Sequence, residues 1–143
     1  AKRGFCIVSG LALGCDTAAH QGCIDANGKT IAVVASGLNI VHPKANEALQ
    51  KEIINKGGLI LSEQPFGVKA NPARLYARNR LQAALAQKVF VVQCAVKSGT
   101  MNTVHFAHEY GCKIYAVAYN QYDEHNAGNE YILKNGIGFP IKL

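Results

Sequence analysis

The sequence predicts an α/β fold of three layers, in which a mostly parallel β-sheet lies between two layers of helices. One observation is that short apolar segments, rich in β-branched residues, recur along the 143 residues. Such segments are typical of strands that are buried on both faces. The other is that a segment of helical composition follows each of them except the last. This alternation requires parallel strands joined by helical crossovers.

The predicted elements follow in order from the N-terminus. The first two strands, residues 5–9 and 30–35, are each followed by a helix, at 16–26 and 46–55. The third and fourth strands, 59–62 and 89–93, lead into helices at 74–87 and 102–109. A fifth strand at 113–118 precedes a last helix at 129–134 and a short strand at 139–142. Gly57, Gly111 and Gly136 each follow a helical segment, where a left-handed residue commonly ends a helix.

Length and composition predict one domain over residues 1–143. Hydrophobic residues make up 49% of the chain and charged residues 17%, which is enough for one sizeable core. The chain starts at what resembles an inner strand, so we expect a domain that lacks its first βα unit. It has neither a run of about eighteen apolar residues nor a signal-peptide cleavage site, which predicts a cytoplasmic protein.

Cysteine and histidine spacing argues against disulfides and against a metal site. The five cysteines are odd in number and form no Cys-x-x-Cys pair. His105 and His108, with Cys112 one turn further, are the best metal candidates, but they lack a fourth ligand. We therefore expect no metal and no cofactor. The formal net charge of +6 favours an anionic partner.

Three loops rich in glycine and serine follow predicted strands, at residues 9–16, 36–39 and 97–100. In a parallel sheet, ligands collect at the carboxyl ends of the strands, where such loops lead into helix N-termini. Glycine allows a close backbone approach, and the helix supplies N–H groups and a positive dipole end, so phosphate is the natural occupant. Ser9, Ser98 and Thr100 add hydroxyl donors, and Lys97 adds charge. The alternative is that these residues only make tight turns.

Arg78, Asn79 and Arg80 form a second candidate feature, for which two interpretations stay open. A helix beginning at Pro72 would place Arg74 and Arg78 on one face and Arg80 on the opposite face, at about 100° per residue. A helix beginning near Arg78 would place all three residues in its first turn, where cations oppose the dipole and an anion would compensate. A solvated basic stripe is the other possibility.

Catalysis has little support in the sequence. Ser9, Asp16 and His20 contain the residue types of a hydrolytic triad, but the G-x-S-x-G pattern of a nucleophile elbow is missing. Asp16 and His20 are also four residues apart on one predicted helix, where we expect a local hydrogen bond. The chain is therefore predicted not to be an enzyme.

The loops resemble those of the DprA (Smf) DNA-processing proteins. The matching segments occur in the family's order and span nearly the whole chain, at residues 9–20, 36–38 with 42–46, 61–65, 78–80, 97–100 and 128–136. The resemblance implies an extended Rossmann-like domain that is homodimeric, binds single-stranded DNA and helps to load a RecA-type recombinase during natural transformation. Leu75 stands where the family has an aromatic residue.

The DNA-contacting positions that the resemblance implies lie in three groups, with Lys44 as an addition: Ser9 and Gly10; Arg78, Asn79 and Arg80; and Lys97, Ser98, Gly99 and Thr100. We expect the three groups to converge on one electropositive pocket. Two alternatives stay open. One is a Rossmann-like domain that binds nucleotides or cleaves nucleoside monophosphates as a phosphoribohydrolase. The other is a nucleotide-sensing module of a signalling or defence protein.

Overall fold

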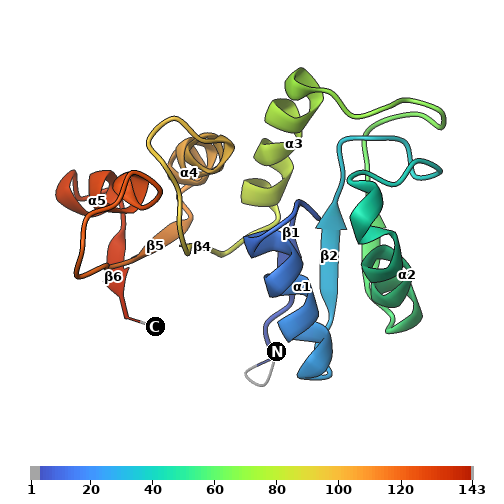
Figure 1. The fold of residues 1–143 in the computed structure, drawn as a ribbon, viewed down its shortest axis with the longest axis horizontal. Coiled ribbons are helices and arrows are strands. Elements are labelled where there is room, and N and C mark those ends of the chain that lie inside the picture. Colours follow the sequence, from blue (N-terminus) through green and yellow to red (C-terminus); the bar gives the residue numbers. More distant parts are fainter. Residues whose placement is uncertain (1–3, 143) are drawn as a thin grey trace. The chain divides into compact units, whose positions relative to one another are not determined.

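The computed structural model describes residues 4–142 of the chain. The chain divides into two compact units, Ala1–Arg78 and Asn79–Leu143. Each unit contains a three-stranded sheet with helices between the strands (Figure 1). All four pairs of neighbouring strands are parallel. The prediction of an α/β fold with parallel strands is therefore confirmed, while a single domain over residues 1–143 stays a prediction.

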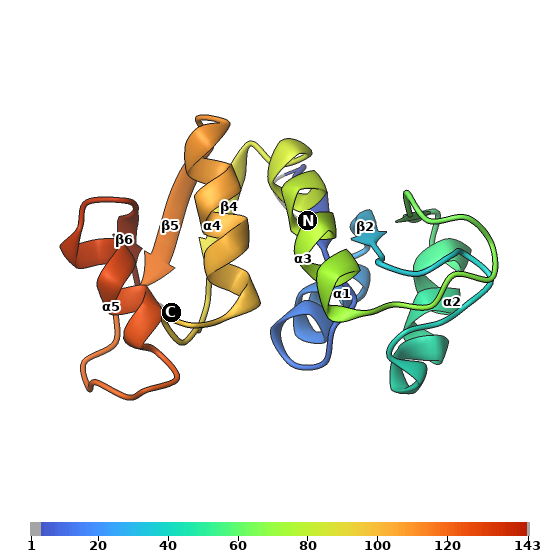
Figure 2. The same ribbon diagram turned by 90° about the horizontal axis from the view of Figure 1, so that it is seen from above.

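The first unit is a βαβαβ arrangement with strand order β1-β2-β3. Its elements are β1 (Ile7–Ser9), α1 (Cys15–Asp25), β2 (Thr30–Val33), a short 3₁₀ turn η1 (Lys44–Asn46), α2 (Glu47–Asn55) and β3 (Leu59–Leu61). Figure 2 shows α1 and α2 on the same side of β2. The core between helices and strands consists of Leu11, Ile24, Ala32, Val34, Leu49 and Ile53.

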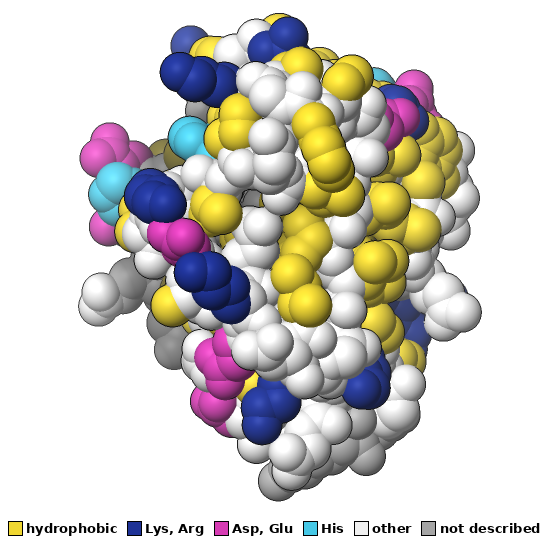
Figure 3. Space-filling view, turned by 90° about the vertical axis from the view of Figure 1, so that its right-hand side faces the viewer, with side chains coloured by type: hydrophobic (Ala, Val, Ile, Leu, Met, Phe, Trp, Pro, Cys, Tyr) yellow, Lys and Arg dark blue, Asp and Glu magenta, His cyan; other side chains and the backbone are white. Residues whose placement is uncertain are grey.

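The side of the first unit that carries α2 and β3 faces the viewer in Figure 3, where hydrophobic side chains gather in the middle of the surface. Ile54 and Leu59, from these elements, are about half exposed, and Phe66 in the following loop is 74% exposed. β3 is the last strand of the three-stranded order, so this unit leaves apolar side chains at one edge of its sheet.

The second unit repeats the βαβαβ arrangement, with strand order β4-β5-β6. Its elements are β4 (Lys88–Val91), α4 (Gly99–Glu109), β5 (Lys113–Val117), α5 (Ala127–Lys134) and β6 (Phe139–Ile141). One face of its sheet packs against the two helices in a core that includes Val91, Val104, Ala107, Ile114, Ala116 and Ile132. Two such halves are the building units of doubly wound α/β proteins.

The boundaries of α3 (Pro72–Ala84) decide between the two interpretations of the arginine cluster. The Asn71 side chain accepts a hydrogen bond from the Arg74 N–H at 2.8 Å and so caps the helix, and Pro72 occupies the first helical position, where its fixed φ is favourable. The interpretation in which the helix begins near Arg78 is therefore wrong. Arg78 and Arg80 lie in the helix interior, about 200° apart around its axis.

The other predicted elements are confirmed, since all six strands and five helices are present and their ends differ from the predicted ones by at most three residues. The five cysteines are free thiols. Within residues 4–142, no three His, Cys, Asp or Glu side chains are grouped to hold a metal ion. No helix in this part of the chain is long and apolar enough to cross a membrane.

Candidate phosphate-binding loops

The loop between β1 and α1 is organised around the carboxylate of Asp16, in the first turn of α1. This carboxylate accepts hydrogen bonds from the Ser9 hydroxyl at 2.6 Å, the Gly10 N–H at 3.1 Å and the Ala12 N–H at 3.0 Å. A carboxylate that gathers donors at a helix N-terminus is favoured by the helix dipole. The structure therefore uses the Ser9 and Gly10 donors to shape the loop. Their contact with a ligand stays a prediction.

Arg78 supports the same loop from inside the first unit. Its Nη1 donates to the Gly10 carbonyl at 2.7 Å and, by a short contact, to the Val33 carbonyl. The side chain is only 7% exposed, and burial lowers its pKa while the nearby Asp16 raises it. A Cβ at Gly10 would lie 2.7 Å from Arg78 Nη1 and 2.8 Å from Asp16 Oδ2, so any other residue would force Arg78 or Asp16 to shift. Arg78 thus positions the loop.

Asn46, at the start of α2, also holds the loop between β1 and α1 in place. Its Nδ2 donates to the Leu11 carbonyl at 2.8 Å and to Thr17 Oγ1 at 2.9 Å, and the Thr17 hydroxyl donates to the Ala12 carbonyl at 2.8 Å. Leu11 is fully buried and has a φ of 63°, a left-handed conformation that costs about 1 kcal/mol or more in a non-glycine residue. The surrounding contacts hold this strained loop in one shape.

A cavity of about 250 Å³ opens beside this loop within the first unit. Its walls are Gly10, Ala12, Leu13, Ala35, His42, Pro43, Leu75 and Arg78. Most of these side chains are apolar, and the volume lies just below the range of about 300–1,000 Å³ that is usual for small-molecule sites. A space of this kind suits a flat, largely apolar group such as a nucleobase.

Lys44 lies next to this cavity in the sequence, directly after Pro43, and is exposed. Its ammonium group forms an ion pair with Glu47 at 2.6 Å, and Lys51 contacts the same carboxylate at 3.2 Å. These two lysines lower the pKa of Glu47. The charge of Lys44 is therefore shared with an acidic neighbour.

His20 is hydrogen-bonded to the strand β2. Its Nδ1 lies 2.7 Å from Thr30 Oγ1, whose hydroxyl donates to the Ile7 carbonyl at 3.0 Å. His20 is fully buried, and its Nε2 has no hydrogen-bond partner among residues 4–142. Burial lowers its pKa, while the charge of Asp16 acts in the opposite direction. The expected hydrogen bond between Asp16 and His20 is wrong, because Asp16 binds the loop and His20 binds Thr30.

In the second unit, the loop after β4 ends at Ser98, which caps the N-terminus of α4 through its backbone geometry alone. The Ser98 Oγ is buried and has no hydrogen-bond partner within the described residues. Lys97 beside it is exposed. A buried hydroxyl without a partner costs about 1–3 kcal/mol and is typical of a place that a ligand or water completes. Lys97, Ser98 and the dipole end of α4 together favour an anion.

Asn79 connects α3 to this loop. Its side chain is 7% exposed and donates to the Gly99 carbonyl at 3.0 Å. Arg80, the next residue, is half-buried. Asn79 is therefore a positioning residue for the start of α4.

Asn129, on α5, holds the beginning of the same loop. Its Oδ1 accepts from the Cys94 N–H at 2.9 Å, and its Nδ2 donates to the carbonyls of Val92 at 2.8 Å and Val91 at 3.1 Å. Gly128 approaches closely as well, since a Cβ there would lie 2.6 Å from Cys94 Sγ. A buried asparagine near the start of a helix thus clamps a strand-to-helix loop in both units.

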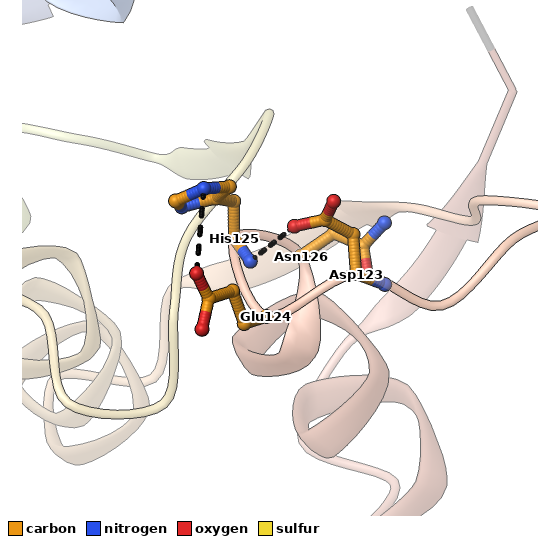
Figure 4. Close-up of polar contacts among 4 residues, drawn as sticks. All are labelled: Asp123, Glu124, His125 and Asn126. Atoms are coloured by element: carbon orange, nitrogen blue, oxygen red, sulfur yellow. Dashed lines mark hydrogen bonds and ion pairs between the residues drawn. The ribbon is translucent and has the colours of Figure 1, made fainter.

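The turn before α5 is closed by hydrogen bonds among its own residues. The Asp123 N–H donates to Asn126 Oδ1 at 2.9 Å. The His125 N–H donates to Asp123 Oδ1 at 2.7 Å (Figure 4). Glu124 and His125 form an exposed contact at 3.8 Å. This turn fixes the backbone that leads into α5.

The sequence-predicted residues fall into two groups. Ser9, Gly10 and Arg78 come together in the first unit, where Lys44 is near the cavity wall, and Asn79 meets the segment 97–100 in the second unit. Convergence of the two groups on one pocket stays a prediction. The sequence analysis missed the clamping roles of Asn46 and Asn129, for which no local signal exists.

Comparison with known proteins places these loops in a family context. The family model described as DNA recombination-mediator protein A matches residues 1–141. The chain is 42% identical to protein Smf of Synechocystis sp. over 116 residues, which are 81% of this chain and 29% of the relative. It is 39% identical to DNA processing protein DprA of Streptococcus pneumoniae over 132 residues, 91% of this chain and 46% of the relative.

Two solved structures are similar to this one. The DNA processing protein A of Streptococcus pneumoniae matches with a TM-score of 0.89 and 35% identity, covering 96% of this chain and 48% of that chain. The other structure was described for the single-stranded DNA binding mode of DNA processing protein A from Helicobacter pylori. It matches with a TM-score of 0.88 and 32% identity, covering 98% of this chain and 62% of that chain. The chain thus spans less than half the length of the curated relatives described above.

Proposed function

Because the chain belongs to the DNA recombination-mediator protein A family, we propose that it binds single-stranded DNA by its sugar–phosphate backbone and acts in DNA processing during natural transformation. The observation that carries this proposal is the start of α4, where the buried Ser98 hydroxyl has no hydrogen-bond partner in the described part of the chain and lies next to the exposed Lys97. A phosphate oxygen would satisfy the hydroxyl, the lysine and the helix dipole together.

The loop of the first unit supports the same proposal. Gly10 lies against a buried arginine and the loop is clamped by Asn46, so its backbone is already in one shape before a ligand arrives. Such preorganisation reduces the entropy lost on binding. The adjoining cavity offers room for one base. Ser9, Gly10, Lys44 and Arg80 are the further positions we propose for backbone contact or for support of it.

We propose that the chain acts by binding and is not an enzyme. The Ser9 hydroxyl donates to Asp16, with no imidazole between them, and His20 is buried against Thr30. The hydroxyl therefore lacks the imidazole of a hydrolytic triad, and the Asp16 carboxylate that accepts from it is also bound to the Gly10 and Ala12 N–H groups. We further propose a RecA-type recombinase and a second copy of the chain as partners in the cytoplasm, as the family resemblance implies.

Fluorescence anisotropy with a labelled oligonucleotide tests the binding proposal. Affinity for single strands should exceed affinity for duplex of equal length and fall by about 0.7 log units per log unit of salt for each neutralised phosphate. Lys97→Gln should lower the salt slope by about that amount. Lys56→Gln is the matched control, because Lys56 is also exposed but follows the C-terminus of α2. Equal effects of both variants, or salt-independent binding, would refute the proposal.

A mononucleotide-binding module is the second candidate, favoured by the cavity of about 250 Å³ beside Gly10. Titration with nucleoside monophosphates separates the two, because a mononucleotide module binds them and ignores oligonucleotides. Chromatography of the same mixtures detects free base, whose release would show phosphoribohydrolase activity and overturn the proposal that the chain is not an enzyme.

A further inference from the structure

Two neighbouring strands of the second unit begin with the same pattern of a lysine, an aliphatic residue and an aromatic residue. β4 starts with Lys88 and Phe90 at its first and third positions, and β5 starts with Lys113 and Tyr115. The strand register pairs Lys88 with Lys113 and Phe90 with Tyr115. Because side chains alternate along a strand, both lysines and both aromatic rings lie on one face of the sheet.

A third ring extends this row onto β6, where Phe139 pairs with Tyr115. The Phe90 and Tyr115 rings stack with their centroids 5.1 Å apart and 14° between their planes, and the Tyr115 and Phe139 rings are tilted at 5.8 Å and 41°. Phe90 is 57% exposed and Phe139 is 60% exposed. We call these three residues the aromatic platform.

The platform lies on the face opposite the helix-covered core. The alternate residues of the same strands, Val91, Ile114 and Ala116, are buried in the core with α4 and α5. Val117, two residues beyond Tyr115 on the platform face, is also buried. The open part of this face is therefore the half near the start of the strands, where the two lysines lie.

The ring contacts contribute to the stability of the sheet, but more than half of the Phe90 and Phe139 surface stays exposed. Like charges at directly opposed positions of a sheet are destabilising, and exposed aromatic surface forgoes the free energy of burial. Both features fit a partner that is anionic and carries flat apolar rings. Single-stranded nucleic acid has that chemistry, since its bases stack on aromatic side chains while lysines contact its phosphates.

We propose that the aromatic platform, with Lys88 and Lys113, is a base-stacking contact for single-stranded DNA, separate from the glycine-rich loops. This inference rests on the proposed function and adds to it a contact with bases. The platform is short, so it takes one or two bases and is tolerant of sequence, because every base has a π-face.

The test compares two ligands of about 20 nucleotides, oligo-dT and an abasic deoxyribose-phosphate oligomer of the same length, by anisotropy. Wild-type protein should bind oligo-dT about tenfold more tightly than the abasic oligomer, which matches one stacked base. The double variant Phe90→Leu with Phe139→Leu should lose most of this ratio and keep its affinity for the abasic oligomer. Leucine keeps both positions apolar, which preserves the fold.

Phe66→Leu is the matched control, because Phe66 is 74% exposed and lies in a loop of the first unit. It should leave the ratio unchanged. A second double variant keeps the test informative if the first one folds poorly. Replacing both lysines, Lys88→Gln with Lys113→Gln, should reduce the slope of log affinity against log salt for oligo-dT by about 1.4, the value for two phosphates. An unchanged slope would count against the platform.

The outcomes separate the two proposals. If wild-type protein binds neither oligomer, the proposed function fails and the platform fails with it. If both oligomers bind and the ratio is the same in wild type and in the Phe90 and Phe139 double variant, only the platform is refuted. If the double variant instead changes the sedimentation coefficient and leaves the ratio intact, the face is an interface between copies of this chain, which also overturns the inference.

Discussion

Replacing Asn129 by alanine should destabilise the second unit by about 3 kcal/mol. Asn129 is 1% exposed and makes hydrogen bonds with the Cys94 N–H and with the carbonyls of Val92 and Val91, at 2.8–3.1 Å. Each such bond contributes about 1 kcal/mol net, and the substitution also leaves buried backbone groups without these partners. The three shorter bonds give the estimate, since the fourth, to the Val117 carbonyl, is longer at 3.3 Å. A chain of this size should then lose about 10 °C in Tm.

Thermal unfolding followed by far-UV circular dichroism measures this loss, and urea unfolding gives the free energy. Asn135→Ala is the matched control, since Asn135 is exposed and makes one side-chain hydrogen bond, to the Tyr131 carbonyl at 2.8 Å. That variant should lose less than about 1 kcal/mol. Binding should respond too, because Asn129 shapes the loop that leads to α4. The affinity for single-stranded DNA should therefore fall in Asn129→Ala and stay unchanged in Asn135→Ala.

The reasoning would be refuted if the two asparagine variants unfolded at the same temperature. It would be weakened equally by an Asn129→Ala protein that lost stability but bound DNA with unchanged affinity. In that case the asparagine would hold the core of the second unit without shaping a functional loop.

Three further predictions concern the first unit. Gly10→Ala forces a Cβ to 2.7 Å from Arg78 Nη1, so it should destabilise by about 1–3 kcal/mol and weaken DNA binding; Gly22→Ala, where a Cβ meets nothing within 4 Å, should do neither. Arg78→Lys cannot reproduce both carbonyl contacts, and should cost about 2 kcal/mol in urea unfolding, whereas an unchanged midpoint would contradict the supporting role. His20 has a folded pKa below its unfolded value of about 6.5, so the unfolded chain binds the extra proton and stability should fall as pH drops below about 6.5, by at most about 1.4 kcal/mol per pH unit from this residue. His20→Gln should flatten that decline, and a stability curve of identical slope in both proteins would contradict it.

Local signals in the sequence carry much of this fold. The order of strands and helices follows from β-branched runs and helical composition, and the start of α3 is encoded in Asn71 and Pro72, a cap followed by the residue best suited to the first turn. The glycine-rich loops and the exposed Lys97 are likewise visible as patterns. These features involve residues close together in the chain, so composition and spacing are enough to predict them.

Only the tertiary structure shows which side chains hold the loops. Asn46 and Leu11 are 35 residues apart, Asn129 and Cys94 are also 35 apart, and Arg78 reaches the Gly10 carbonyl across 68 residues. A buried polar side chain is satisfied by whatever backbone groups the packing of strands and helices brings near it, and local propensity contains no information about those partners. For the same reason, the sequence shows lysine and aromatic residues in two strands, but strand register alone places them side by side on one face.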